Sequence, residues 1–178
     1  MTKLRQNRRQ FLGTTAATLA AAGLYAPAVH AQSRVVRVGY VTAQTGPLAA
    51  FAEVDEFIIN GVLEALSGGI ASGGTTFTLE VIVKDSQPNP NRAAEDAREL
   101  IIDDEIDIML VGNTPETTNP VSTICEIEEV PCISSLSPWQ PWFIGRQGNP
   151  GDPSTWGEFD YTYHAFWGLE DVIAVFTN

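Results

Sequence analysis

The chain has 178 residues and is acidic, with 22 aspartate and glutamate residues against 10 lysine and arginine residues and a formal net charge of −12. This excess of negative charge repels phosphate backbones and anionic lipid headgroups, so it excludes nucleic acid and membrane surfaces as expected partners. The length allows one ordinary domain with a sizeable core.

The first predicted element is an export signal over residues 1–31. Arg8 and Arg9 precede Phe-Leu and an uncharged, alanine-rich stretch at residues 13–29, and small residues lead to Ala31. This order predicts a signal peptide cleaved near Ala31, and the paired arginines indicate twin-arginine export. A membrane anchor or a buried helix is the alternative, but the stretch is shorter than the roughly 20 residues that span a bilayer and is rich in alanine and threonine rather than leucine. We therefore expect recognition by an export translocase and a mature protein in the periplasm.

Removal of this segment makes the mature chain more acidic. The segment contains four basic residues and no acidic ones, so the formal net charge changes from −12 to −16. The remaining sequence contains no apolar run of membrane-spanning length, so we expect a mature chain that is not embedded in a membrane.

Beyond the signal, strand and helix patterns alternate. Runs of β-branched residues predict strands, and apolar residues spaced three and four apart predict helices. In chain order the expected elements are a strand at 35–41, a helix at 50–66, a strand at 77–83, a helix at 93–101, a strand at 106–111, a helix at 116–128 and a strand at 131–135. This alternation predicts an α/β fold in which a parallel sheet carries helices on both faces, in three layers (αβα).

The C-terminal part differs in composition. Residues 145–157 are rich in glycine and proline and predict an exposed loop. Residues 161–167 alternate aromatic and smaller side chains, as in a short strand, and residues 168–176 begin an apolar helix. The chain stops at Asn178 inside this pattern, without a cap or breaker, so we expect a fragment of a longer protein.

Ligands of an open parallel sheet bind beside the loops that leave the carboxyl ends of its strands. The loop after the strand at 106–111 leads into a helix, where the hydroxyls of Thr114 and Thr117 can hold a ligand anion together with free backbone N–H groups. The alternative is that Thr114 caps the helix and Pro115 simply occupies its first turn. Glu116 either favours an amino group on the ligand or complements the helix dipole.

Aromatic residues follow the strand at 131–135. Trp139, Trp142 and Phe143 cluster there, and Phe51, after the first strand, can face the same cleft. Such side chains suit an apolar or flat ligand, but packing in the core accounts for them equally well.

The sequence offers little for catalysis. Outside residues 1–31 it has one histidine, His164, and no nucleophile-elbow, phosphate-loop or dinucleotide-binding motif. We therefore expect a protein that is not an enzyme and that uses no cofactor or metal. Cys125 and Cys132 are the two cysteines. Outside the cytoplasm they either pair or stay free, because spacing does not fix disulfide geometry.

Several segments together resemble one family. They are the export signal, residues 38–49 with their Thr45-Gly46-Pro47 turn, residues 84–86 before an alanine-rich helix, and the strand ends near Gly112 and Ser134. In this combination the chain resembles the periplasmic solute-binding proteins of ABC transporters, of the branched-chain amino acid (Leu/Ile/Val) type. The resemblance implies two α/β lobes that close on a small molecule and pass it to a membrane permease. It divides the chain into a first lobe at 34–160 and, at 161–178, a crossing strand and the first helix of a second lobe.

The resemblance also implies where the ligand binds. In amino-acid-binding members, hydroxyls and N–H groups after the third and fourth strands hold the ligand carboxylate. Pro115 and Pro138 depart from that pattern because proline offers no N–H. The solute that the resemblance implies is a small organic molecule, either an amino acid or a related amide or organic acid. A ligand-sensing receptor of the same fold and a periplasmic enzyme are the alternatives. The expected ligand contacts are Pro47, Leu48, Phe51, Thr114, Glu116, Thr117, Leu136, Ser137 and Trp139.

Overall fold

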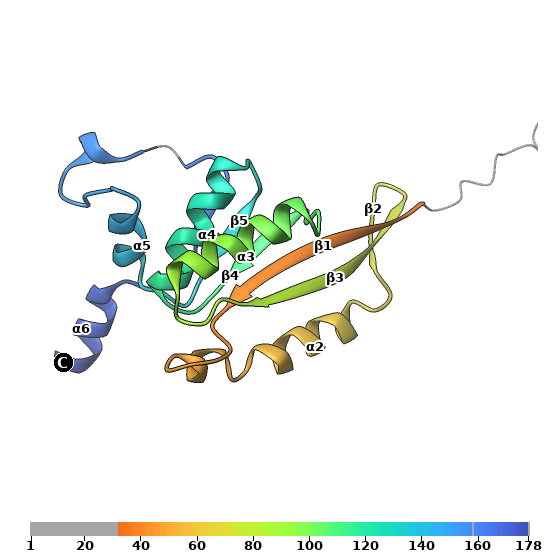
Figure 1. The fold of residues 1–178 in the computed structure, drawn as a ribbon, viewed down its shortest axis with the longest axis horizontal. Helices are drawn as coiled ribbons and strands as arrows, with labels where there is room; N and C mark the ends of the chain where they lie inside the picture. The colour runs from red at the N-terminus through yellow and green to blue at the C-terminus, as the bar shows by residue number, and fades with distance from the viewer. Residues whose placement is uncertain (1–31, 158, 178) are drawn as a thin grey trace, which may run out of the picture. The chain divides into compact units, whose positions relative to one another are not determined.

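One six-stranded sheet organises the chain, in the strand order β2-β3-β1-β4-β5-β6. Figure 1 labels its strands β1 to β5. The computed structural model describes residues 32–157 and 159–177, so Arg8, Arg9 and the expected cleavage site at Ala31 lie outside the described residues. The strands are β1 (Gln32–Thr42), β2 (Ile70–Ser72), β3 (Thr75–Asp85), β4 (Ile108–Val111), β5 (Cys132–Ser134) and β6 (Thr162–His164).

Most of the sheet is parallel, as the alternating pattern predicts. β4 pairs with β1 and with β5, and β5 pairs with β6, all in parallel. In this register Val41 lies opposite Val111, Val111 opposite Ser134, and Ser134 opposite His164. The carboxyl ends of β1, β4, β5 and β6 therefore meet at one edge of the sheet, and the loops that follow them are neighbours.

One strand that the sequence analysis did not predict pairs antiparallel at a margin of the sheet. β2 is antiparallel to β3, with Ile70 opposite Phe77, and the turn between them is built on Gly73 and Gly74. Both glycines have positive φ, 58° and 80°, as a two-residue hairpin requires. β2 has three residues, all exposed, so it carries none of the apolar alternation by which strands are recognised.

Helices cover both faces of the sheet, which confirms the predicted three-layer α/β fold. α3 (Pro90–Ile102) and α4 (Pro115–Ile127) pack against each other on one face, and α2 (Asp55–Ala65) lies along the other (Figure 1). α3 begins where Asn89 Oδ1 accepts hydrogen bonds from the backbone N–H groups of Asn91 and Arg92, with Pro90 in the first turn. The expected helix at 50–66 is divided into a 3-10 turn (Ala49–Ala52) and α2.

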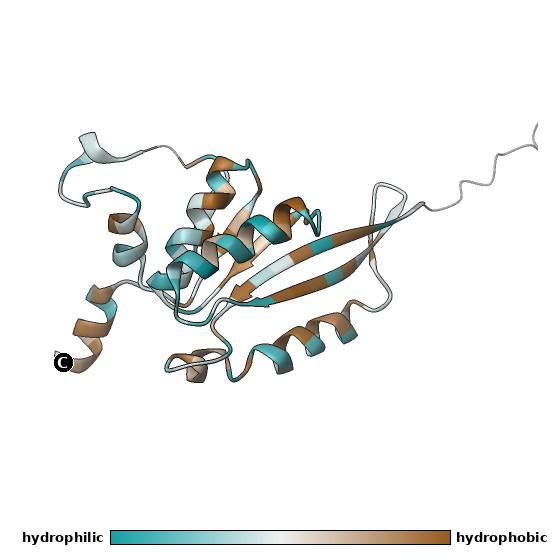
Figure 2. Ribbon diagram, viewed as in Figure 1, coloured by the Kyte–Doolittle hydropathy of each residue, from teal (hydrophilic) through white to brown (hydrophobic). Residues whose placement is uncertain are grey.

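The main core lies between the sheet and the α3–α4 layer. Val41, Met109 and Val111 of the strands and Leu100 and Val121 of the helices are buried there. Figure 2 shows apolar bands along β1 and β3, interrupted by hydrophilic ones, and hydrophilic residues that recur along α3. This pattern is the one expected of a sheet buried beneath amphipathic helices.

The C-terminal part contains one helix that the sequence analysis missed. Residues expected to form an aromatic loop after β5 form α5 (Trp139–Gly145), a seven-residue helix with Pro141 in its first turn. The exposed loop at 145–157 contains a 3-10 turn at Pro153–Thr155, and α6 (Leu169–Thr177) forms the expected apolar helix. Within the part of the chain that the structure describes, no helix is long and apolar enough to cross a membrane.

Candidate functional site

A cavity of about 300 Å³ opens at the edge of the sheet where the parallel strands end. Loops after β1, β4, β5 and β6 contribute to its wall, as expected for an open parallel sheet. Its lining residues are Phe51, Asn113, Thr114, Pro115, Leu136, Ser137, Pro138, Phe166 and Trp167. The fold thus brings together four of the predicted ligand contacts, namely Phe51, Thr114, Leu136 and Ser137.

Thr114 lies at the N-terminus of α4, but its side chain does not cap the helix. Its backbone carbonyl accepts hydrogen bonds from Thr117 N (3.0 Å) and Thr118 N (2.9 Å). Its hydroxyl makes no capping bond, and Oγ1 has no hydrogen-bond partner among the described residues. The alternative in which the Thr114 side chain serves as a cap is therefore wrong, and its buried hydroxyl is left without a partner among the described residues. Pro115 occupies the first turn, as expected.

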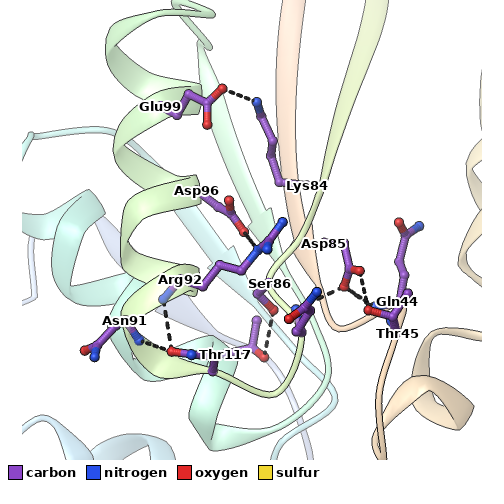
Figure 3. A network of polar contacts seen from close by, with 12 residues as sticks. Gln44, Thr45, Lys84, Asp85, Ser86, Asn91, Arg92, Asp96, Glu99 and Thr117 are labelled. Atoms are coloured by element: carbon purple, nitrogen blue, oxygen red, sulfur yellow. Dashed lines mark hydrogen bonds and ion pairs between the residues drawn. The ribbon is translucent and has the colours of Figure 1, made fainter.

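The other predicted contacts do not line the cavity. Thr117 is fully buried, and its Oγ1 lies 3.5 Å from Ser86 Oγ, where α4 packs on the loop after β3 (Figure 3). The Trp139 indole N–H donates to Glu170 Oε1 (2.9 Å) at the start of α6. Glu116 is exposed on α4, and Pro47 and Leu48 belong to the turn that leads to Phe51.

Asp85 fixes the start of that turn. Its carboxylate accepts hydrogen bonds from Gln44 N (2.9 Å), Thr45 Oγ1 (2.6 Å) and Gln87 N (3.0 Å) (Figure 3). Partial burial raises the pKa of Asp85, but the hydrogen bonds outweigh it and lower the pKa overall. The loops after β1 and β3 are therefore tied together beside the cavity.

Asn113 is a cavity residue that sequence reasoning missed. It follows Gly112 at the end of β4, has a φ of 95°, and is 1% exposed. Its Nδ2 donates to Thr42 Oγ1 (3.1 Å), and Thr42 Oγ1 donates to Asp55 Oδ2 (2.8 Å). Asn113 Oδ1 is buried and finds no partner within the described part of the chain. Asparagine directly after a strand, where positive φ is tolerated, is a weak sequence signal for such a position.

The phenol of Tyr40 lies close to Thr42 and Asp55 of this network. Burial, and next the charge of Asp55, raise the pKa of its phenol above the usual range. Gly112 makes this arrangement possible, because a Cβ at that position would lie 2.9 Å from Tyr40 Oη.

Two aromatic residues that follow β6 complete the cavity wall. The rings of Phe166 and Trp167 lie 4.5 Å apart between centroids. The sequence pattern assigned both residues to a strand at 161–167, but β6 ends at His164 and the chain then turns to the cavity. Strand periodicity alone could not distinguish these positions.

Trp142 and His164 pack against each other, which is the alternative given above for Trp142. The rings stack with centroids 5.1 Å apart, and the Trp142 indole N–H donates to Ser122 Oγ (3.2 Å). His164 Nε2 contacts the backbone carbonyl of Ser137 at 2.7 Å, and Nδ1 contacts Ser134 Oγ at 2.7 Å. Because a carbonyl only accepts, Nε2 carries a proton, and burial lowers the pKa of His164. The imidazole thus ties β6 to the segment after β5.

A larger cavity of about 400 Å³ lies between α2 and the strands β1, β3 and β4. Its wall is mainly apolar, with Ile58, Ile59, Val62, Val81 and Leu110, and of the loops at the carboxyl edge only the one after β5 reaches it, through Ser135 and Leu136. We assign the candidate site to the smaller cavity because polar groups without partners converge there.

Cys125 and Cys132 are neighbours in the core. Both are fully buried, one on α4 and the other on β5. The contact with Cys132, followed by burial, raises the pKa of the Cys125 thiol. Residues 32–157 and 159–177 contain no cluster of three or more side chains suited to a metal ion.

Comparison with known proteins identifies a family for this chain. A family model described as "Periplasmic binding protein" matches residues 35–176. No curated protein matches the chain significantly.

Solved structures share the fold at low identity. The branched-chain amino acid transporter substrate-binding protein LivJ of Streptococcus pneumoniae, in complex with isoleucine, is 18% identical, with a TM-score of 0.59 over 76% of this chain and 34% of that one. An ABC transporter substrate-binding protein of Sphaerobacter thermophilus is 22% identical, with a TM-score of 0.55 over 81% and 37%.

A third structure has an aromatic ligand. A solute-binding protein of an ABC transporter from Rhodopseudomonas palustris, in complex with p-hydroxybenzoic acid, is 20% identical, with a TM-score of 0.55 over 75% of this chain and 32% of that one. The chain thus spans about a third of the length of these structures. The family match over residues 35–176, together with the parallel sheet and its edge cavity, shows that the chain belongs to the periplasmic binding protein family.

Proposed function

We propose that this chain is part of an extracytoplasmic solute-binding protein that delivers a small organic solute to an ABC permease. The observation that carries the proposal is the cavity at the carboxyl edge of the sheet, with aromatic walls and the free hydroxyl of Thr114. A cavity that is mostly apolar, with a few convergent polar groups, suits a small ligand. Isoleucine and p-hydroxybenzoic acid, the ligands of two structural neighbours, are of suitable size for such a site.

The mechanism we propose is closure of two lobes on the solute. Residues 34–160 form the first lobe in this proposal, and 161–178 form the crossing segment and the first helix of the second. Glu126 holds the crossing segment to α4, because its carboxylate accepts hydrogen bonds from Asp160 N (2.7 Å) and Thr162 Oγ1 (2.8 Å). Solute contacts that exist only between closed lobes shift the equilibrium toward the closed form, which the permease then recognises.

The proposed location is the periplasm, reached through the twin-arginine signal at Arg8 and Arg9. The family is one of extracytoplasmic binding proteins, which agrees with export. In that compartment we propose that Cys125 and Cys132 form a disulfide, because the two buried side chains are in contact and thiols are oxidised there. The proposed role involves no catalytic step.

Ligand-dependent stabilisation tests the proposal. The protein expressed from its complete reading frame is screened by thermal shift against amino acids, amides and aromatic acids. A solute present at 100 times its Kd raises the free energy of unfolding by about 2.7 kcal/mol, which is readily measured. Uptake of the same solute should then depend on the gene in cells.

A matched pair of variants identifies the site. Phe51→Ala removes a cavity wall, whereas Phe57→Ala removes an equally large side chain that is 82% exposed on α2, outside the cavity. We expect Phe51→Ala to weaken binding at least tenfold and Phe57→Ala to leave it unchanged. Equal effects of the two variants, or conversion of the solute to a product, would contradict the proposal.

A further inference from the structure

We propose that Asn113 selects the solute, by offering an oriented acceptor oxygen to an O–H or N–H donor on a flat, apolar ligand. This inference rests on the proposed function and names the ligand class of the same cavity. It assigns a specificity-determining role to a residue that the sequence pattern does not mark.

The direction of a buried hydrogen-bond chain fixes the Asn113 amide. The Asp55 carboxylate, 5% exposed, can only accept, so Thr42 gives its single hydroxyl hydrogen to Asp55 Oδ2 at 2.8 Å. Thr42 Oγ1 must therefore accept from Asn113, which it does from Nδ2 at 3.1 Å. A flipped amide would bring Asn113 Oδ1 against an oxygen that has no hydrogen left to give. Asp55 and Thr42 thus act as positioning residues, and Oδ1 is directed away from Thr42.

The oriented oxygen belongs to a cavity-lining residue and is left without a partner in the described part of the chain. Asn113 Oδ1 and Thr114 Oγ1 are both buried, belong to consecutive lining residues, and have no hydrogen-bond partner among residues 32–157 and 159–177. An unsatisfied buried acceptor is costly, and such atoms are normally paired. The backbone of Asn113 is also held at a φ of 95°, as is typical of functional positions. A donor on the solute would satisfy the oxygen.

The rest of the wall defines the body of the solute. Phe51, Phe166 and Trp167 present aromatic surfaces, and none of the nine lining residues is charged. Aromatic walls favour a flat apolar body, and the absence of Lys and Arg from this lining gives a carboxylate no cationic partner. A carboxylate at Asn113 would also oppose acceptor to acceptor. Phenols, aryl amines and primary amides have the required chemistry at this end.

Probes paired so that methylation removes the donor test the inference. Binding of para-hydroxybenzoate and para-methoxybenzoate, and of benzamide and N,N-dimethylbenzamide, is measured by titration calorimetry with the protein from its complete reading frame. We expect the donor-bearing member of each pair to bind at least tenfold more tightly, because loss of a buried hydrogen bond strongly disfavours the analogue that lacks it. Equal binding within the pairs, tighter binding of the methylated members, or no binding of any of the four overturns the inference.

Two substitutions attribute the selectivity to this network. Asn113→Gly removes the acceptor at a positive φ that glycine accepts, and Thr42→Val frees the amide while Asn113 stays in place. Both are expected to reduce the affinity ratio within each pair toward one. Thr162→Val is the matched control, because it removes another buried threonine-to-carboxylate hydrogen bond, to Glu126 at 2.8 Å, outside the cavity. It should leave the ratio unchanged.

The outcomes separate this inference from the proposed function. Tight binding of another solute in the wider screen, with ratios near one for the donor pairs, overturns the role of Asn113 and leaves solute binding intact. Failure of every solute in that screen overturns the proposed function itself. A ratio that falls in Thr162→Val as much as in Thr42→Val shows a general structural effect and refutes the assignment.

Discussion

A disulfide between Cys125 and Cys132 would stabilise the fold measurably. Both residues are buried where α4 packs on β5, in the main core. Oxidation removes two protons and two electrons from the thiols, and an exchange-partner protein disulfide accepts them and becomes a dithiol. The bond closes a loop of eight residues, counted from Cys125 to Cys132. Chain-entropy arithmetic for such a loop gives a gain of about 2.5 kcal/mol in the free energy of unfolding at 25 °C, before any native-state strain is subtracted.

The assay is equilibrium urea unfolding of protein exported by its own signal, with and without dithiothreitol. We expect reductant to lower the free energy of unfolding by about 2 kcal/mol, and to have no effect on a variant with alanine at both cysteines. Peptide mapping gives an independent measurement. The sequence has no Lys or Arg between Arg98 and Arg146, so trypsin leaves both cysteines in one peptide. That peptide should be lighter by two hydrogen atoms and should take up alkylating reagent only after reduction.

Two results would refute the disulfide. The first is alkylation of both thiols in unfolded, unreduced protein from the exporting cells. The second is an unfolding free energy that does not change on full reduction, because the loop constraint would then be absent. Protein made without the signal, in the reducing cytoplasm, provides the control with free thiols.

Three further predictions concern stability. Gly39→Ala is expected to lower the free energy of unfolding by about 1–3 kcal/mol, because the new Cβ would lie 2.7 Å from Ile106 Cδ1 in a packed core. A free energy of unfolding in urea equal to that of the wild type would contradict this, because it would mean that the Ile106 side chain moves aside without cost. Leu100→Ala should lower the free energy of unfolding by about 3 kcal/mol, because it leaves a cavity in the core. A loss below about 1 kcal/mol in the same urea assay would contradict this, because it would mean that neighbouring side chains fill the cavity. Burial lowers the folded-state pKa of His164, so the stability that the neutral imidazole contributes above the unfolded-state pKa of about 6.5 is lost as the pH falls below that value. His164→Gln should remove this loss from a plot of unfolding free energy against pH. An unchanged plot would exclude His164 as its source.

The sequence predicted those parts of the fold that have strong periodicity. β1 and β3 are long and rich in β-branched residues, and α3 and α4 show apolar spacing, so type and order followed directly. β2 was not predicted because its three residues are all exposed and show no apolar alternation. α5 escaped because seven residues, with Pro141 among them, give too little helical repeat, and its aromatic side chains indicate a loop mouth as readily as a helix.

The candidate site, too, was predicted only in part. Phe51, Thr114, Leu136 and Ser137 were predicted because strand ends determine which loops converge. Asn113 was not, because its role depends on Thr42, which is 71 positions away in the sequence, and on Asp55 behind it. Local patterns cannot report a hydrogen-bond chain that only the folded sheet assembles.

Proline at two lining positions bears on what this lobe offers a ligand. Pro115 occupies the first turn of α4 and Pro138 the N-cap of α5, so each helix start has one N–H fewer to offer a carboxylate. At α4, the N–H of Thr117 is already bonded to the carbonyl of Thr114. Asn113 adds an acceptor beside these missing donors. Each feature alone would only weaken a carboxylate site, but together they reverse the polarity of this end of the cavity. We therefore infer that a solute carboxylate, where present, faces away from this wall and that its hydrogen-bond donors face Asn113.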